Sequence, residues 1–185
     1  KLGEISGLPK TYKAVARLGE TSTTGDPEGV VTERPCTPPS QERIQEVFQS
    51  FTGAIQQIPP MYSALKHQGQ RLYELAYQGK EVERSPRTVT IHELKLMELQ
   101  ADEFEIAVWC SKGTYIRTLG EDIGAAVGCG AHVIQLRRTA AGPFQQQEMV
   151  SMSAVRAAAE QGTEALDRLL LGTDSILRDV PALVL

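Results

Sequence analysis

The sequence predicts an α+β fold, and three observations lead to that class. Segments 10–18 and 103–110 alternate apolar and polar side chains, as half-buried strands do. Segments 41–51 and 115–127 repeat their apolar residues at helical spacing instead. Along the chain the elements follow in the order strand, helix, strands, helix, strand, which is typical of an α+β protein.

The first strand is expected over 10–18 and gathers its apolar residues on one face. These residues are Tyr12, Ala14, Ala16 and Leu18. The following stretch, TSTTGDPEG at 21–29, consists of turn-forming residues, and a short strand is expected at 30–33.

A helix is predicted over 41–51, because Ser40 can cap its start after two prolines and Gly53 ends it. Its apolar stripe consists of Ile44, Val47, Phe48 and Phe51.

Pro59 and Pro60 exclude one regular element over 56–70. Beyond them we expect a short helix at 71–78 and strands at about 87–99 and 103–110. The short helix would turn Leu72, Leu75 and Ala76 inward.

The last large elements are a helix at 115–127 and a strand at 131–139. After about residue 145 the pattern changes to short helices, one capped by Ser153 and one at about 163–171. This change indicates a small terminal subregion and not a second full domain.

The charge balance bears on nucleic-acid binding. A formal net charge of −4 argues weakly against it. The charge is uneven, however, with five cations and three acids from Tyr62 to Thr88, and four cations and two acids from Val108 to Thr139. From Ala140 to the end the balance reverses, with three cations against six acids, so a locally basic middle can still contact phosphate.

The cysteines and histidines are scattered, without metal-ligand spacing. We therefore expect no metal site, and we expect Cys36, Cys110 and Cys129 to be reduced thiols of a cytoplasmic protein. No apolar run is long enough for a membrane span, and we expect no signal peptide.

The segment CSKGTYIRT at 110–118 connects a buried strand to an amphipathic helix, which is a common place for a functional site. Lys112 and the helix-start amides could meet an anion, Tyr115 offers a flat face and a hydroxyl, and Arg117 offers a planar cationic fork. The residues alone leave open the alternative that Arg117 is a surface arginine and Tyr115 a packing residue.

Three blocks of sequence, in the same order, resemble the TruB family of tRNA pseudouridine synthases. They are KTYKAVARLGETSTTGDPEG at 10–29, PPMYSALKHQGQRLYELAYQGKEVERSPRTVTIHEL at 59–94 and CSKGTYIRTLGEDIGAAVGCGAHVIQLRRTAAGPF at 110–144. The resemblance runs from about residue 10 to about residue 185. It implies the pseudouridine synthase fold, a mixed and mostly antiparallel sheet flanked by helices with an RNA-clasping insertion.

The resemblance also implies an activity. The family isomerises one T-loop uridine of tRNA, at tRNA position 55, to pseudouridine, using an essential aspartate and neither a metal nor an organic cofactor. The target base must be extracted into a pocket, as in other base-flipping enzymes. The implied partner is the T arm of tRNA.

The resemblance also implies roles for individual residues, according to their positions in the matching blocks. Arg117 matches the arginine that pairs with the catalytic aspartate, and Tyr12 matches the tyrosine that stacks on the target uracil. Tyr12 is also a candidate for the proton-abstracting base. Tyr115 and Leu136 match residues that line the base pocket, and Asp26 matches an acidic position near the RNA.

The resemblance divides the chain into a catalytic domain at 1–145 and a helical extension at 146–185 that leads towards an RNA-binding module. Within the catalytic domain, about 56–84 correspond to the RNA-clasping insertion, called the thumb below. Expected RNA contacts are Lys66, Arg71, Lys80, Lys112 and Arg138. The alternative for the thumb is a solvated loop with ordinary surface charges.

One departure from the family concerns the nucleophile. The motif G-x-L-D-P-x-A-x-G, which holds the catalytic aspartate, does not occur in the 185 residues. Asp26 is followed by proline but lies downstream of Tyr12, so we reject it as the nucleophile. Residues 2–4 resemble the segment shortly after the motif, and 179–185 resemble the start of the C-terminal module.

From this departure we expect an intact protein that is longer at both ends, and we expect the 185-residue chain to be inactive by itself. Arg117 is then expected to lack a carboxylate partner. A second hypothesis is a non-catalytic tRNA-binding or tRNA-folding protein on the same scaffold, and a third is a structural α+β domain without an RNA role. We expect a monomer.

Overall fold

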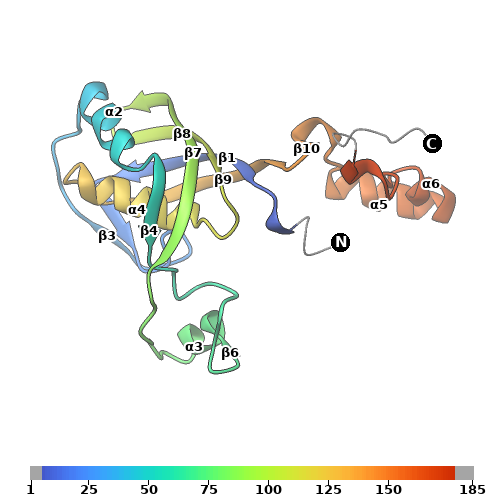
Figure 1. Cartoon of the computed structure of the whole chain (residues 1–185), viewed down its shortest axis with the longest axis horizontal. Coiled ribbons are helices and arrows are strands. Elements are labelled where there is room, and N and C mark those ends of the chain that lie inside the picture. The colour runs from blue at the N-terminus through green and yellow to red at the C-terminus, as the bar shows by residue number, and fades with distance from the viewer. Residues whose placement is uncertain (1–5, 178–185) are drawn as a thin grey trace.

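The computed structural model describes residues 6–177, so the predictions for 2–4 and for 179–185 fall outside the described residues. The chain forms a six-stranded antiparallel sheet with two helices packed on one face, which confirms the α+β prediction (Figure 1). The strand order is β10-β9-β1-β8-β7-β4. The strands are β1 (Lys10–Leu18), β4 (Gly53–Gln57), β7 (Arg87–Gln100), β8 (Glu103–Cys110), β9 (Ala131–Ala141) and β10 (Phe144–Gln145), and the helices are α2 (Gln41–Ser50) and α4 (Ile116–Ala126).

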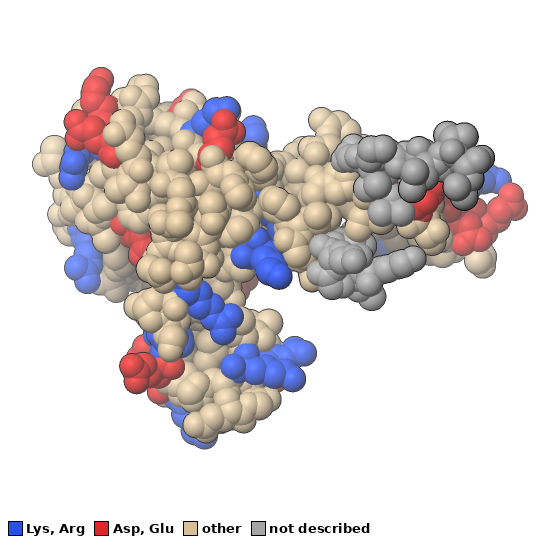
Figure 2. All heavy atoms as spheres, viewed as in Figure 1, with Lys and Arg blue, Asp and Glu red and all other residues tan. Residues whose placement is uncertain are grey.

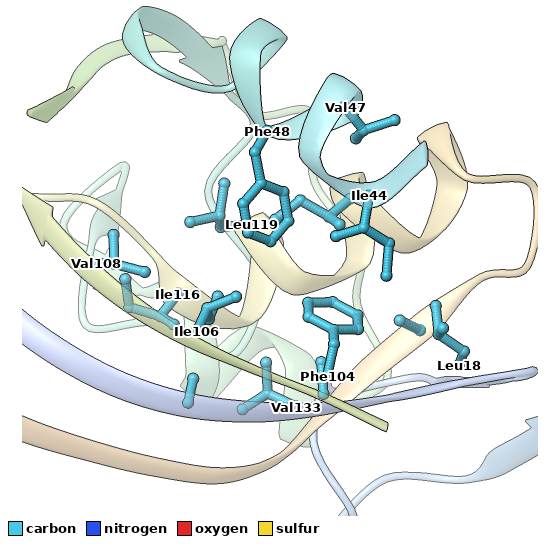
Figure 3. Close-up of a cluster of buried hydrophobic side chains, with 14 of the residues drawn as sticks. Leu18, Ile44, Val47, Phe48, Phe104, Ile106, Val108, Ile116, Leu119 and Val133 are labelled. Atoms are coloured by element: carbon cyan, nitrogen blue, oxygen red, sulfur yellow. The ribbon is translucent and has the colours of Figure 1, made fainter. Parts of the chain in front are cut away.

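The core lies between the sheet and these two helices (Figure 3). Strand β8 alternates as predicted, so that Phe104, Ile106 and Val108 are buried beneath the helices. Phe48 of α2 meets Phe104 edge to face, with ring centroids 6.4 Å apart. Burying each large apolar side chain contributes about 1.5–3 kcal/mol, so this cluster fixes α4 on the sheet.

Helix α4 lies especially close to strand β9. A Cβ atom built on Gly120 would lie 2.7 Å from Cγ2 of Val133, closer than two carbon atoms can pack. The absence of a side chain at Gly120 therefore permits the approach that brings the start of α4 over the sheet.

Several predicted boundaries are confirmed within one or two residues, including Ser40 as the cap of α2, whose Oγ accepts from the backbone N–H of Arg43. The predicted cap at Ser153 is wrong. Helix α5 (Met152–Gln161) is capped by Ser151, whose Oγ accepts from the backbone N–H of Ala154. The last α-helix, α6 (Thr163–Asp167), is also shorter than predicted.

The remaining elements extend this frame. A hairpin of β2 (Glu20–Ser22) and β3 (Val31–Glu33) carries the 23–30 loop. Beyond β10, α5 and α6 project from one end of the sheet with the 3-10 helices η1 (Gln146–Glu148) and η2 (Ser175–Leu177) (Figure 1). Among the described residues, no helix combines the length and the hydropathy needed to cross a membrane.

The thumb extends away from the sheet between β4 and β7 (Figure 1). It contains β5 (Lys66–His67), β6 (Gln70–Arg71) and α3 (Leu72–Tyr77). Gln68 and Gly69 turn the β5–β6 hairpin with φ values of 50° and 87°, as a two-residue turn with both φ positive requires. Leu72 and Leu75 are buried as predicted, which gives the thumb a small apolar centre of its own.

The prediction of three reduced thiols is wrong. Cys36 and Cys129 form a disulfide across 93 residues of sequence, and Cys110 is a buried free cysteine. The bond joins the segment after β3 to the turn between α4 and β9. Sequence spacing did not reveal it, because the two cysteines meet only when the hairpin packs against the end of α4.

Replacing Cys36 by serine should lower the free energy of unfolding by about 2–4 kcal/mol, because the unfolded chain regains the freedom that the disulfide removes. Guanidinium unfolding of oxidised protein measures the loss. Adding reductant should bring the wild type to the level of Cys36→Ser and leave the variant unchanged. Equal midpoints for the oxidised wild type and the variant would contradict the disulfide.

Candidate active site at the start of α4

Asp26 is fixed inside the 23–30 loop by its neighbours. Its Oδ1 accepts from Thr24 Oγ1 at 2.6 Å and from the backbone N–H of Glu28 at 3.1 Å. The loop is tied to the sheet because the backbone N–H of Val133 donates to the carbonyl of Gly25 at 3.0 Å. The acidic residue singled out from the sequence is therefore held in one orientation.

Arg117 has a carboxylate partner, so the prediction that it lacks one is wrong. Its Nη1 donates to Asp26 Oδ2 at 2.6 Å and to the carbonyl of Thr24 at 3.0 Å. Its Nη2 donates to the carbonyl of Tyr62 at 2.9 Å. The guanidinium thus joins three elements, namely α4, the 23–30 loop and the thumb, and both charged side chains are only 23% exposed.

Asp26 is ionised in this arrangement. Burial by itself would raise its pKa, but hydrogen bonds from Thr24, Arg117 and the Glu28 backbone, with the positive charge of Arg117, hold the pKa below its ordinary value. A carboxylate with this many donors serves as a fixed anchor for Arg117, not as a group that exchanges protons.

Tyr115 caps the start of α4 with an extended backbone and without a side-chain cap of its own. Its backbone is held by Gln57, whose Oε1 accepts from the Tyr115 N–H at 3.0 Å and whose Nε2 donates to the Tyr115 carbonyl at 3.2 Å. Gln57 is only 2% exposed. Sequence reasoning predicted no strand over 53–57 and therefore missed Gln57 as a buried residue at the end of β4.

Tyr12 and Leu136 lie on neighbouring strands, β1 and β9. Tyr12 is partly buried, and the guanidinium of Arg138 lies 5.6 Å from the centroid of its ring, a cation–π contact. Leu136 pairs in register with Ala14 and is 48% exposed. This pair of strands therefore presents an aromatic ring, an exposed apolar side chain and a cation.

Lys10 is a cation that the sequence reasoning did not select. Burial lowers its pKa, and the positive charges of Arg138 and Lys112 lower it further. Its Nζ donates to the carbonyls of Ser6 and Leu8, each at 2.6 Å. Arg138 and Lys112 are thus close enough to Lys10 to repel its charge, which makes this end of the sheet attractive to an anion.

The thumb carries the other predicted cations, and Figure 2 shows basic side chains gathered on the thumb and on the neighbouring part of the body. Lys66 lies in β5 and Lys80 follows α3. Arg71 donates to the hydroxyl of Tyr73 at 2.9 Å and also lies over its ring. Arg84, which was not selected, donates to the carbonyl of Pro59 at 3.1 Å and so closes the base of the thumb.

A cavity of about 570 Å³ opens between the thumb and the 23–30 loop. The Asp26–Arg117 pair forms part of its wall, with the tyrosines of the thumb on the other side. The rings of Tyr62 and Tyr77 meet edge to face, with centroids 5.8 Å apart. Its size suits a small-molecule or nucleoside-sized group. Among residues 6–177, no group of three or more His, Cys, Asp or Glu is arranged to hold a metal ion.

Glu121 lies one helical turn after Arg117 and is the most perturbed carboxyl of the site. Burial raises its pKa to about 7, the negative charges of Asp122 and Asp26 raise it too, and the positive charge of Arg117 opposes them. Its carboxyl group packs beside Gly25, where a Cβ atom would lie 3.1 Å from it. The 23–30 loop therefore rests on a carboxyl that changes charge near neutral pH.

Replacing Asp26 by asparagine should lower the free energy of unfolding by about 2 kcal/mol, because Arg117 loses a charged hydrogen-bond partner in a partly buried setting. Chemical denaturation measures the change. The control is Glu164→Gln, which removes the exposed ion pair with Arg168 and should cost less than about 1 kcal/mol. Equal effects of both variants would argue against a structural role for the Asp26–Arg117 pair.

Replacing Glu121 by glutamine should stabilise the protein increasingly from pH 5 to pH 8. The folded-state pKa of about 7 exceeds the ordinary value of 4.5, so the wild type loses stability as pH rises through this window. Glutamine cannot ionise, so the variant does not lose this stability. The difference in melting temperature between variant and wild type, measured across this pH range, tests the prediction. A difference between Glu121→Gln and wild type that stays constant across this pH range would refute the prediction.

Two family models match consecutive parts of the chain. Residues 2–116 match "TruB family pseudouridylate synthase (N terminal domain)", and residues 117–178 match "tRNA pseudouridylate synthase B C-terminal domain". The first match alone covers more than half of the chain and includes Tyr12, Asp26 and Tyr115.

Curated relatives agree with these matches. The tRNA pseudouridine synthase B of Nitrosococcus oceani is 52% identical over 181 residues, which are 97% of this chain and 59% of the relative. That of Pseudomonas fluorescens strain Pf0-1 is 54% identical over 176 residues, 94% of this chain and 57% of the relative. The chain thus spans somewhat more than half the length of the relatives that it matches.

Solved structures support the fold alone, because their identity to the chain is under 25%. A Cbf5-Nop10-Gar1 complex contains a chain with a TM-score of 0.66 and 24% identity, over 93% of this chain and 44% of that one. An H/ACA RNP bound to a substrate RNA containing 2'-deoxyuridine gives a TM-score of 0.65 and 20% identity, over 95% of this chain and 44% of that one. The pseudouridine synthase fold is confirmed, and by sequence the chain belongs to the TruB family of pseudouridylate synthases.

Proposed function

We propose that the protein of which this chain forms part isomerises the T-loop uridine at position 55 of tRNA to pseudouridine. The N1–C1' glycosidic bond of the uridine breaks, the base turns, and a C5–C1' bond forms while C5 gives up a proton and N1 takes one up. Reactant and product have the same composition, so the reaction needs no redox partner, and we propose that it uses neither metal nor organic cofactor. The family match that spans the site from Tyr12 to Arg117 carries the proposal.

The proposed roles carry over from the family by position in the sequence. Arg117 orients the catalytic aspartate and keeps it ionised, Tyr12 stacks on the target uracil, and Tyr115 and Leu136 line the base pocket. Tyr12 is also the proposed proton-abstracting base. Asp26 takes the role of an anchor that holds Arg117, since it uses both carboxylate oxygens within the protein.

We propose that the nucleophilic aspartate lies outside these 185 residues, because the motif that carries it in the family does not occur among them. Asp26 does not take that role, because it lies downstream of Tyr12 and its Oδ1 is held inside its own loop by Thr24 and the backbone N–H of Glu28. By itself, the 185-residue chain is then inactive. Arg117 keeps a bond to the Tyr62 carbonyl that a second carboxylate could displace, since an ionised acceptor is the stronger partner.

The T arm of tRNA is the proposed ligand of two basic regions. The thumb supplies Lys66, Arg71 and Lys80, and the end of the sheet supplies Lys112 and Arg138. Contacts of these cations with phosphate should make binding fall steeply as salt rises. We further propose that the protein acts in the cytoplasm, as a monomer.

Full-length protein should release tritium from unmodified tRNA that carries 5-tritiated uridine, and Arg117→Lys should lower kcat by about a hundredfold or more. A lysine cannot serve three acceptors in the fixed geometry of a guanidinium fork. Arg156→Lys, at an exposed position of α5, is the matched control and should leave kcat unchanged.

The result also separates the alternatives. Salt-sensitive tRNA binding without tritium release from the full-length protein would favour the non-catalytic tRNA-binding or tRNA-folding protein. Absence of both would favour a structural domain without an RNA role.

A further inference from the structure

Both polar atoms of the Gln57 amide bind one residue of the site. The side-chain oxygen accepts a hydrogen bond from the backbone N–H of Tyr115, and the side-chain nitrogen donates one to the Tyr115 carbonyl. With only 2% of its surface exposed, Gln57 cannot exchange these partners for water. The two bonds fix both peptide groups that flank Tyr115, and so its position and the direction in which α4 begins.

The same arrangement holds the root of the thumb, defined here as residues 57–62. At its first residue, Gln57 is bonded to Tyr115. At its last residue, the carbonyl of Tyr62 accepts from Arg117 at 2.9 Å. Pro59 and Pro60 stiffen the stretch between these points, since each proline fixes its own φ. The root is therefore attached at both ends to the first turn of α4.

We propose that Gln57 is a positioning residue. It holds Tyr115 directly, and it holds Arg117 through the first turn of α4, in the geometry that the reaction requires. It also joins the thumb to these two residues. The inference rests on the proposed function for its catalytic consequence. Its structural part concerns the orientation of Tyr115 and stands by itself. Gln57 touches neither reacting atoms nor RNA in this role, so it acts on the chemical step and not on affinity.

Strand β4 offers a matched control at the preceding residue. Gln56 is exposed on the opposite face and donates to the hydroxyl of Thr88 at 2.8 Å. Gln56→Leu and Gln57→Leu thus make the same chemical change in the same strand, and only the second removes bonds to Tyr115. Gln57→Glu is a third variant of nearly the same shape, which keeps an oxygen acceptor for the Tyr115 N–H and loses the donor to the Tyr115 carbonyl.

The experiment measures tritium release and T-arm binding by full-length protein for all three variants. Gln57→Leu should lower kcat about tenfold to a hundredfold, the effect of a displacement of about 1 Å in a reacting group. The dissociation constant for a T-arm stem-loop should change by less than about twofold, because the cations that contact phosphate are untouched and the bond from Arg117 to the Tyr62 carbonyl still attaches the thumb. Gln56→Leu should match the wild type, and Gln57→Glu should lie between the two.

A second readout does not depend on activity. With 3-fluorotyrosine in place of tyrosine, the fluorine signal of Tyr115 is identified by its loss in Tyr115→Phe. That signal should shift or broaden in Gln57→Leu and Gln57→Glu and stay in place in Gln56→Leu. Either Gln57 variant that folds suffices for this readout, since both remove the donor to the Tyr115 carbonyl.

The outcomes separate this inference from the proposed function. An unchanged Tyr115 signal in Gln57→Glu, or wild-type kcat in a folded Gln57 variant, overturns the positioning role while the function stands. A parallel loss of affinity and kcat also overturns it, since that pattern belongs to a binding residue. If wild-type protein releases no tritium, the proposed function fails, and a shifted Tyr115 signal still supports the structural part.

Discussion

The guanidinium of Arg117 is the interaction on which the site depends. Its hydrogen bonds reach the 23–30 loop through Asp26 and Thr24 and the thumb through the carbonyl of Tyr62. Each of these acceptors belongs to a segment that leaves the sheet. An arginine can serve them together because its donors are fixed in one plane and remain charged at any physiological pH. Removing that charge would leave Asp26 as an unpaired, partly buried anion.

The sheet in turn makes this position of Arg117 possible. Strand β8 ends at Cys110, the chain turns, and α4 runs back over the sheet with Gly120 against β9. The first turn of α4 therefore stands at the end of the sheet where the thumb leaves β4. Core packing of Leu119 and Ile123 fixes the helix, so the arginine needs little further ordering to reach its acceptors.

Sequence patterns predicted the elements whose periodicity comes from burial. The alternation in β8 and the helical stripe of α2 were visible because one face of each is apolar. The patterns failed where a polar group fills a buried position, as Gln57 does. They also failed where the decisive contact joins residues about ninety positions apart, as in the Arg117–Asp26 pair and the disulfide between Cys36 and Cys129. Such contacts follow from the folded topology, and local spacing carries no trace of them.

The thumb is, in topological terms, an enlarged turn of a β-hairpin. Strands β4 and β7 are antiparallel neighbours in which Gln57 pairs with Arg87, so the two ends of the excursion stay beside each other whatever lies between them. Lengthening such a turn costs only a slowly growing loop entropy. The insertion can therefore vary in length or sequence during evolution without disturbing the register of the sheet, and its reach over a ligand can be adjusted separately from the frame that holds the catalytic groups.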